Sequence, residues 1–172
     1  MDNFEITKIC NSDPLIAPMF IGVFPADLLP KSMEKNKVLV ANLSDSSKPG
    51  SHWIVIYNTV KTLYYIDSFG KKPGSNDIVT AIESYNSTIE YNDKQLQHDL
   101  SNQCALWCII FIYFISRDLT PQEIINQYFS SDLLYNELLV RNFSVQVFDL
   151  DRLPTLINVE KLIKNIYKNE VV

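Results

Sequence analysis

The strongest constraint in this sequence is an uninterrupted apolar run that begins at Cys104 and continues to Ile115. The run is apolar on every side, which in a segment of this length favours a helix enclosed by the rest of a domain. It is well short of the roughly twenty apolar residues that span a bilayer. We therefore predict a central buried helix from Cys104 to Ser116 and no association with a membrane.

Shorter strands and helices are predicted around this central helix. The strand candidates are β-branched runs bounded by turn formers, and Asn58 to Lys61 has the length of a hairpin turn. Thr120-Pro121-Gln122-Glu123 combines an N-cap residue, proline at the first helical position and a capping glutamate, which predicts a helix start. We predict strands over Val38 to Leu43, His52 to Tyr57, Leu63 to Asp67 and Thr88 to Leu96, and helices over Asp77 to Tyr85, from Thr120, over Asp132 to Val140 and over Pro154 to Lys168. The predicted fold class is α+β, with the central helix packed on a mixed sheet and flanked by other helices.

Length and charge indicate one globular domain over residues 1–172. The chain of 172 residues, 47% of them hydrophobic, is long enough for one core, and no change of composition marks a second domain. The net charge of −5 comes from interspersed acidic and basic side chains, so we expect no nucleic-acid patch. The small basic cluster Lys71-Lys72 lies in a turn-like stretch and is interpreted as loop solvation. We expect a monomer.

The three cysteines argue against a secreted disulfide scaffold. Cys10, Cys104 and Cys108 are odd in number and have no repeating spacing, which favours a reducing compartment. The N-terminal residues lack the basic and apolar stretches of a secretory signal, so we predict a chain that is not secreted. Zinc would need two further soft or imidazole ligands beside the Cys104 and Cys108 pair. We predict no metal site and no required cofactor.

A cysteine and a histidine are the candidates for chemistry. The chain has two histidines, His52 and His98, and His52 opens a predicted strand directly after a glycine-containing loop. Cys104 stands at the start of the predicted central helix, where the helix dipole favours a thiolate over a thiol. Cys108 follows one turn later and is interpreted as a core residue. A purely structural position for His52, at the end of a strand, remains the alternative.

Several motifs, taken in order, resemble those of the adenain-type cysteine endopeptidases of adenoviruses, other DNA viruses and virus-like transposons. The resemblance runs from about Phe20 to Phe143, and the order of histidine, acid, glutamine and cysteine is more specific than any single motif. The segments that carry it are Met19 to Phe24 with Leu29-Pro30, Ser51-His52-Trp53, Tyr65 to Gly70, and Gln97-x-x-x-Ser101-x-x-Cys104 with Cys108.

This resemblance implies a papain-like fold and a role for each matching residue. Cys104 would be the nucleophile, His52 the base and Asp67 the group that orients the imidazole. Gln97 would donate its amide to the oxyanion, beside the Cys104 backbone N–H. Trp53 would narrow the cleft and favour small substrate residues, especially glycine. Activation by DNA or by a disulfide-linked peptide, as in adenain, is not expected of an acidic chain without an obvious matching cysteine.

The function that the resemblance implies is maturation of viral capsid or core precursor proteins. Such an enzyme would work in the virion and in the interior of infected cells, nucleus or cytoplasm. A protease that removes ubiquitin-like modifiers is an alternative, because that group shares the catalytic order and also cuts after Gly-Gly. An inactive relative that binds peptides or builds a particle is a further alternative, because Ala105 stands where the family usually has glycine.

His52 is preferred to His98 as the base because of its expected support. A base needs its second ring nitrogen held by a carboxylate or a carbonyl. Asp67 would supply that group if the strands of His52 and Asp67 pair through the Asn58 to Lys61 turn. His98 has only Asp99 nearby, and adjacent side chains generally point apart.

Overall fold

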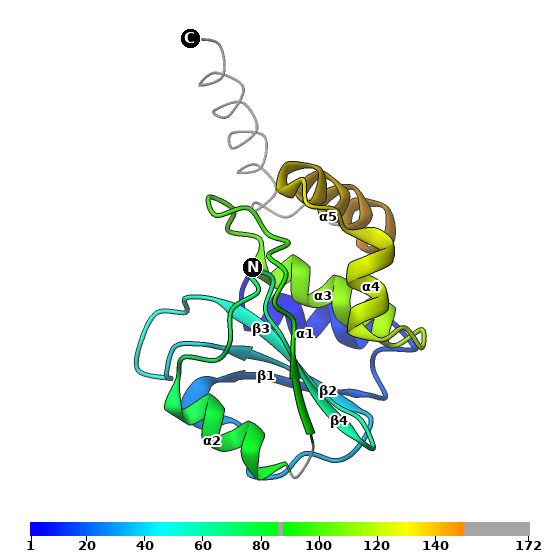
Figure 1. Ribbon diagram of the computed structural model, residues 1–172. Helices are drawn as coiled ribbons and strands as arrows, with labels where there is room; N and C mark the ends of the chain where they lie inside the picture. The colour runs from blue at the N-terminus through cyan, green and yellow to red at the C-terminus, as the bar shows by residue number, and fades with distance from the viewer. Residues whose placement is uncertain (86–87, 150–172) are drawn as a thin grey trace.

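The computed structural model describes residues 1–85 and 88–149 (Figure 1). These residues form five α-helices, one short 3-10 helix and a mixed sheet of five strands. In chain order the elements are α1 (Asn3–Ser12), β1 (Phe20–Pro25), η1 (Ala26–Leu28), β2 (Lys37–Asn42), β3 (Trp53–Asn58), β4 (Thr62–Ile66), α2 (Asn76–Ser84), β5 (Thr88–Tyr91), α3 (Cys104–Ile115), α4 (Pro121–Tyr128) and α5 (Leu133–Phe148). The predicted α+β class is confirmed.

The sheet follows the strand order β1-β2-β3-β4-β5. Strands β2, β3 and β4 form an antiparallel meander, and the edge strands β1 and β5 run parallel to their neighbours. The β3–β4 hairpin turns where it was predicted, and Val55 pairs with Ile66. Because β3 starts at the end of the hairpin where β4 finishes, the register brings His52 and Asp67 to the same edge of the sheet.

Helices cover both faces of the sheet (Figure 1). Alternate residues of β2 point to opposite faces, as the two-residue period of a strand requires. Val38 and Val40 join a core with α1, α3, α4 and α5, whereas Leu39 and Ala41 join a second core under α2. The molecule is thus a three-layer arrangement with the sheet in the middle.

Helix α3 occupies the centre of the larger core, as predicted. Every side chain from Cys104 to Ile112 is buried, and the helix packs against β3. None of the helices within residues 1–85 and 88–149 combines the length and the apolar character needed to cross a bilayer.

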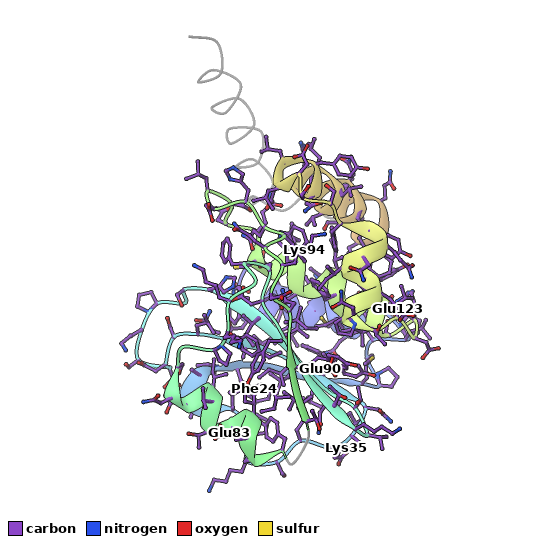
Figure 2. All side chains as sticks on the ribbon, in the orientation of Figure 1. Phe24, Lys35, Glu83, Glu90, Lys94 and Glu123 are labelled. Atoms are coloured by element: carbon purple, nitrogen blue, oxygen red, sulfur yellow. The ribbon has the colours of Figure 1, made fainter. Side chains whose placement is uncertain are left out.

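Helix α4 begins with the reciprocal cap that was expected. Thr120 N–H donates to Glu123 Oε2 at 2.8 Å, and Glu123 N–H donates to Thr120 Oγ1 at 3.3 Å; Figure 2 labels Glu123 at this helix. This pair supplies partners for two backbone donors that a helix start otherwise leaves without one. The predicted helix start at Thr120 is confirmed.

The predicted strand from Thr88 to Leu96 is wrong in its second half. Strand β5 stops at Tyr91 because the side chain of Asn92 takes the next pairing position beside β4. Asn92 accepts from the backbone N–H of Asp67 at 2.8 Å and donates to the Asp67 carbonyl at 2.6 Å. A side chain therefore replaces the backbone ladder at this point.

Other helix and strand boundaries also differ from those expected. Helix α5 continues to Phe148, beyond the predicted end at Val140, and α1 and β1 were not predicted as a helix and a strand. The predicted helix from Pro154 to Lys168 lies outside the described residues.

Candidate active site

His52 and Asp67 are joined by a short hydrogen bond at the sheet edge. His52 Nε2 lies 2.7 Å from Asp67 Oδ1. The same oxygen accepts the backbone N–H of Phe69 at 2.8 Å, and the Phe69 ring lies 4.8 Å from the imidazole, centroid to centroid. Because the Asp67 oxygen is an acceptor, His52 Nε2 carries a hydrogen and Nδ1 is the nitrogen left for a second partner.

A tight turn after β4 holds Asp67 in place. Gly70 N–H donates to the Asp67 carbonyl at 2.8 Å, and Gly70 has a φ of 67°, in the region that favours glycine. A Cβ at this position would come within 2.7 Å of the Lys94 backbone. Phe69 therefore holds the Asp67 carboxylate, and Gly70 allows the backbone at Lys94 to pack closely against this turn.

Cys104 is the first residue of α3 and the second partner of His52. Its side chain is close enough to the imidazole that it helps, together with Asp67, to raise the pKa of His52. The preceding residue, Gln103, makes no side-chain cap, so the first N–H groups of α3 have no partner within the helix. The sulfur thus meets the imidazole at the positive end of the helix, a position that stabilises a thiolate.

The protonation state of His52 is set by its two partners. Burial acts to lower the pKa of His52, because it penalises the imidazolium. Hydrogen bonds to Asp67 and Cys104, together with the negative charges of both, outweigh burial and raise this pKa to about 9. At neutral pH the arrangement favours an imidazolium beside the sulfur.

The other two cysteines differ from Cys104 in the depth of their burial. All three are buried and free of disulfide bonds, but Cys10 and Cys108 are 0% and 3% exposed, against 8% for Cys104. Burial raises the pKa of Cys10 to about 12 and also raises the pKa of Cys108 well above its ordinary value. These thiols are therefore poor nucleophiles at neutral pH.

The Gln97 side chain is buried near the site and has no exposed surface. Its Oε1 accepts from Ser68 Oγ at 2.6 Å, and its Nε2 donates to the Ser101 carbonyl at 3.0 Å. Nε2 also donates to Ser101 Oγ at 3.3 Å, so donation to an oxyanion would require Gln97 to give up its bond to this hydroxyl. The role of Gln97 as an oxyanion donor stays a prediction.

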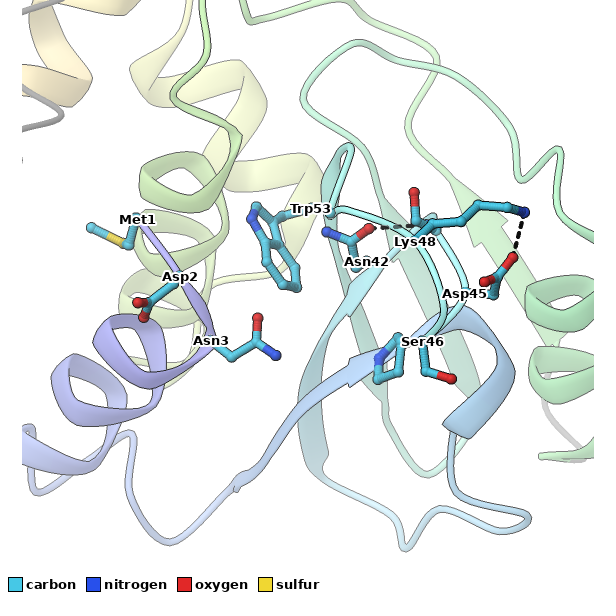
Figure 3. Close-up of a pocket in the computed structure, with 11 residues that line it drawn as sticks. Met1, Asp2, Asn3, Asn42, Asp45, Ser46, Lys48 and Trp53 are labelled. Carbon is cyan, nitrogen blue, oxygen red and sulfur yellow. Dashed lines mark hydrogen bonds and ion pairs between the residues drawn. The ribbon is translucent and has the colours of Figure 1, made fainter.

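Trp53 borders a hollow of about 470 Å³ beside the site, which Figure 3 shows. The hollow lies between the start of α1, the end of β2 and the loop before β3. Asn42 belongs to its lining, and its Oδ1 accepts from the backbone of Ser44 and Ser51. Asn42 Nδ2 is buried without a partner in the described part of the chain.

His98 faces its own loop. Its Nδ1 accepts the backbone N–H of Leu100 at 3.2 Å, and its own N–H donates to Glu137 Oε1 at 3.0 Å. The loop therefore uses one ring nitrogen of His98 as an acceptor.

Three polar residues at the site were not anticipated. Ser68 and Asn92 hold Gln97 and Asp67, and Glu137 on α5 holds the loop before Cys104. Glu137 had a signal in the sequence, since it is the single acid between Leu133-Leu134 and the apolar run Leu138-Leu139-Val140. Ser68 and Asn92 lie in turns where polar residues are ordinary, so no local signal marked them.

We expect replacement of Asp67 by asparagine to shift the alkaline limb of activity. The raised pKa of His52 predicts that kcat/KM falls as pH rises through about 9, because the imidazolium loses its proton. Asp67→Asn removes a negative charge that stabilises the imidazolium, so the limb should move down by about one pH unit or more. The pH dependence of kcat/KM measures this shift. Asp99→Asn, at an exposed carboxylate, is the control and should leave the limb in place.

The fold and the site together define an α+β protein in which a cysteine at a helix start, a histidine and an aspartate form one connected cluster. Within the described residues, no group of three or more His, Cys, Asp or Glu side chains could hold a metal ion. No known protein family matches the chain, and no curated protein matches it either.

Proposed function

We propose that the chain is a cysteine endopeptidase of the adenain type, with a papain-like catalytic arrangement. The observation that carries the proposal is the hydrogen bond between Asp67 and His52, with Cys104 at the start of α3 near enough to the imidazole to raise its pKa. Three residues far apart in sequence meet in the order that nucleophilic catalysis needs: a thiol, an imidazole and an orienting carboxylate.

In the proposed mechanism, the Cys104 thiolate attacks the carbonyl carbon of the peptide bond. The oxyanion that forms lies near the unpartnered N–H groups at the start of α3, with the Gln97 amide as the proposed second donor. The His52 imidazolium gives its proton to the leaving amine, and the C–N bond breaks to leave a thioester on Cys104. Water then attacks the thioester while His52 takes up its proton, which releases the acid and restores the thiolate.

The position of Ala105 supports an active enzyme over an inactive relative. Ala105 stands where the resembled family usually has glycine, and an extra methyl could crowd the cleft. The side chain is buried and belongs to the larger hydrophobic core. The methyl group therefore packs inward.

The proposed substrates are viral capsid or core precursor proteins cut next to small residues, in the virion or inside infected cells. The hollow beside Trp53 would hold substrate residues near the cut bond. Removal of ubiquitin-like modifiers is the second candidate, because a cleft that selects glycine also suits a Gly-Gly end.

Two substrate sets tested in parallel distinguish these functions. The full chain is incubated with virion precursor proteins and, separately, with fusions that carry a ubiquitin-like modifier ending in Gly-Gly. The proposal expects cleavage of the precursors, lost in Cys104→Ala. Selective cleavage of the modifier fusions would replace maturation by deconjugation. Cleavage of neither substrate would contradict the proposed activity.

A further inference from the structure

Glu137 is a buried carboxylate that the proposed chemistry does not use. It lies on α5 with no exposed surface. Among the described residues, no lysine or arginine forms an ion pair with it, and burial raises its pKa although hydrogen bonding from His98, Ser101 and Trp107 and the charge of His98 act against that change. Burying a carboxylate without a cation opposes folding. Its place in the core therefore calls for a specific role.

Two donors to Glu137, His98 and Ser101, belong to the loop between Gln97 and Cys104. Glu137 Oε1 accepts the backbone N–H of His98 at 3.0 Å, and Oε2 accepts the Ser101 hydroxyl at 2.9 Å. The two oxygens of one carboxylate thus hold the two ends of a short turn, which is itself closed by a bond from Ser101 N–H to the His98 carbonyl.

Ser101 connects Glu137 to both proposed oxyanion donors, which are the Gln97 amide and the Cys104 backbone N–H. Its carbonyl accepts Gln97 Nε2 at 3.0 Å, which orients the amide. Its hydroxyl oxygen accepts the backbone N–H of Gln103 at 3.3 Å, and Gln103 directly precedes Cys104. One serine therefore contacts the side chain of Gln97 and the backbone that leads into the first N–H of α3.

We propose that Glu137 is a positioning residue for the oxyanion-binding groups, acting through Ser101 on Gln97 and on the backbone before Cys104. The inference rests on the proposed function, but it concerns a separate part of the reaction. The Cys104–His52–Asp67 series lies on α3 and the sheet edge, whereas Glu137 holds the loop from α5. Loss of the hydrogen bonds from His98 and Ser101 to Glu137 should therefore weaken stabilisation of the oxyanion and leave the Cys104 thiolate unchanged.

The test compares two readouts in folded variants of the full chain. Alkylation of Cys104 by iodoacetamide reports on the thiolate and needs no oxyanion site, whereas hydrolysis of a Gly-Gly peptide amide needs both. We expect Glu137→Gln, which puts an N–H₂ where one acceptor stood, to lower kcat by about tenfold to a hundredfold. KM and the rate of alkylation should each change by less than about threefold.

Two further variants make the comparison specific. Ser101→Ala removes the hydroxyl that donates to Glu137 and changes no residue of α5, so it should also lower kcat. This variant keeps the test informative if Glu137→Gln does not fold. Ser144→Ala is the matched control: its buried hydroxyl on α5 bonds only to the Val140 carbonyl, at 2.7 Å. Its kcat should match the wild type. Combining Glu137→Gln with Gln97→Ala should cost less than the product of the two single effects, since part of the Glu137 effect acts through Gln97.

The possible results separate the two proposals. An unchanged kcat in folded Glu137→Gln, or in Ser101→Ala if Glu137→Gln does not fold, would overturn the positioning role and leave the proposed protease intact. Alkylation that slows in parallel with kcat would also overturn it, because the residue would then act on the thiolate. A wild-type chain that neither alkylates at Cys104 nor cuts the peptide would remove the proposed function itself.

Discussion

Replacing Cys104 with alanine is expected to lower kcat/KM for peptide hydrolysis by about ten-thousandfold or more. The reason is that no other described thiol can take its place. Cys108 lies one turn further along α3 but is fully buried, and burial raises its pKa well above the ordinary value. Steady-state hydrolysis of a Gly-Gly peptide amide by the purified variant measures the loss.

Cys108→Ala is the matched control for this prediction. It removes a thiol from the same helix while leaving the contacts of Cys104 with His52 in place, so kcat/KM should stay within about threefold of the wild type, provided that the variant is folded. An active Cys104→Ala variant would exclude Cys104 as the nucleophile. A folded but inactive Cys108→Ala variant would contradict the assignment of Cys108 to the core alone.

The second large effect distinguishes the two histidines. We expect His52→Ala to lower kcat/KM by about a thousandfold or more, because it removes the only described imidazole that bonds to Asp67 and whose pKa is raised by Cys104. His98→Ala should change kcat/KM by less than about tenfold. The His98 ring accepts a bond from Leu100 N–H, and its link to Glu137 runs through the backbone, which alanine keeps.

Comparison of kcat/KM for these two variants at one pH gives the measurement. Circular dichroism of each variant serves as the control for folding. A large loss in His98→Ala together with near-normal activity in His52→Ala would remove His52 from the mechanism.

Much of the fold could be predicted because local signals agreed with the tertiary structure. Helix α3 is apolar on all faces and proves to be enclosed, and the cap at Thr120 is a local arrangement that needs no distant partner. The β3–β4 hairpin likewise depends on a short turn. The pairing of His52 with Asp67 followed from that hairpin, since an antiparallel register brings the start of one strand to the end of the next.

The elements that were missed depend on contacts between distant segments or on signals that were overlooked. Strand β5 ends early because Asn92 binds the backbone of Asp67, a contact across 25 positions that no local pattern reveals. Helix α1 had a readable signal: Asp2 and Glu5 form a reciprocal cap like that of Thr120 and Glu123. The buried position of Gln97 also depends on a distant contact. Ser68 donates to the side-chain oxygen of Gln97, and nothing in the sequence around Ser68 indicates this bond.

The most direct test of the Cys104–His52 pair is the rate at which a thiol reagent modifies each cysteine below pH 7. His52 should be charged in this range, since its pKa is raised to about 9, and its imidazolium favours a thiolate at Cys104. Cys10 is an internal reference in the same molecule, because burial raises its pKa to about 12. Peptide mapping after brief treatment with iodoacetamide quantifies both sites. The account predicts rapid alkylation of Cys104 that is abolished in His52→Ala; alkylation of Cys104 no faster than that of Cys10 would contradict it.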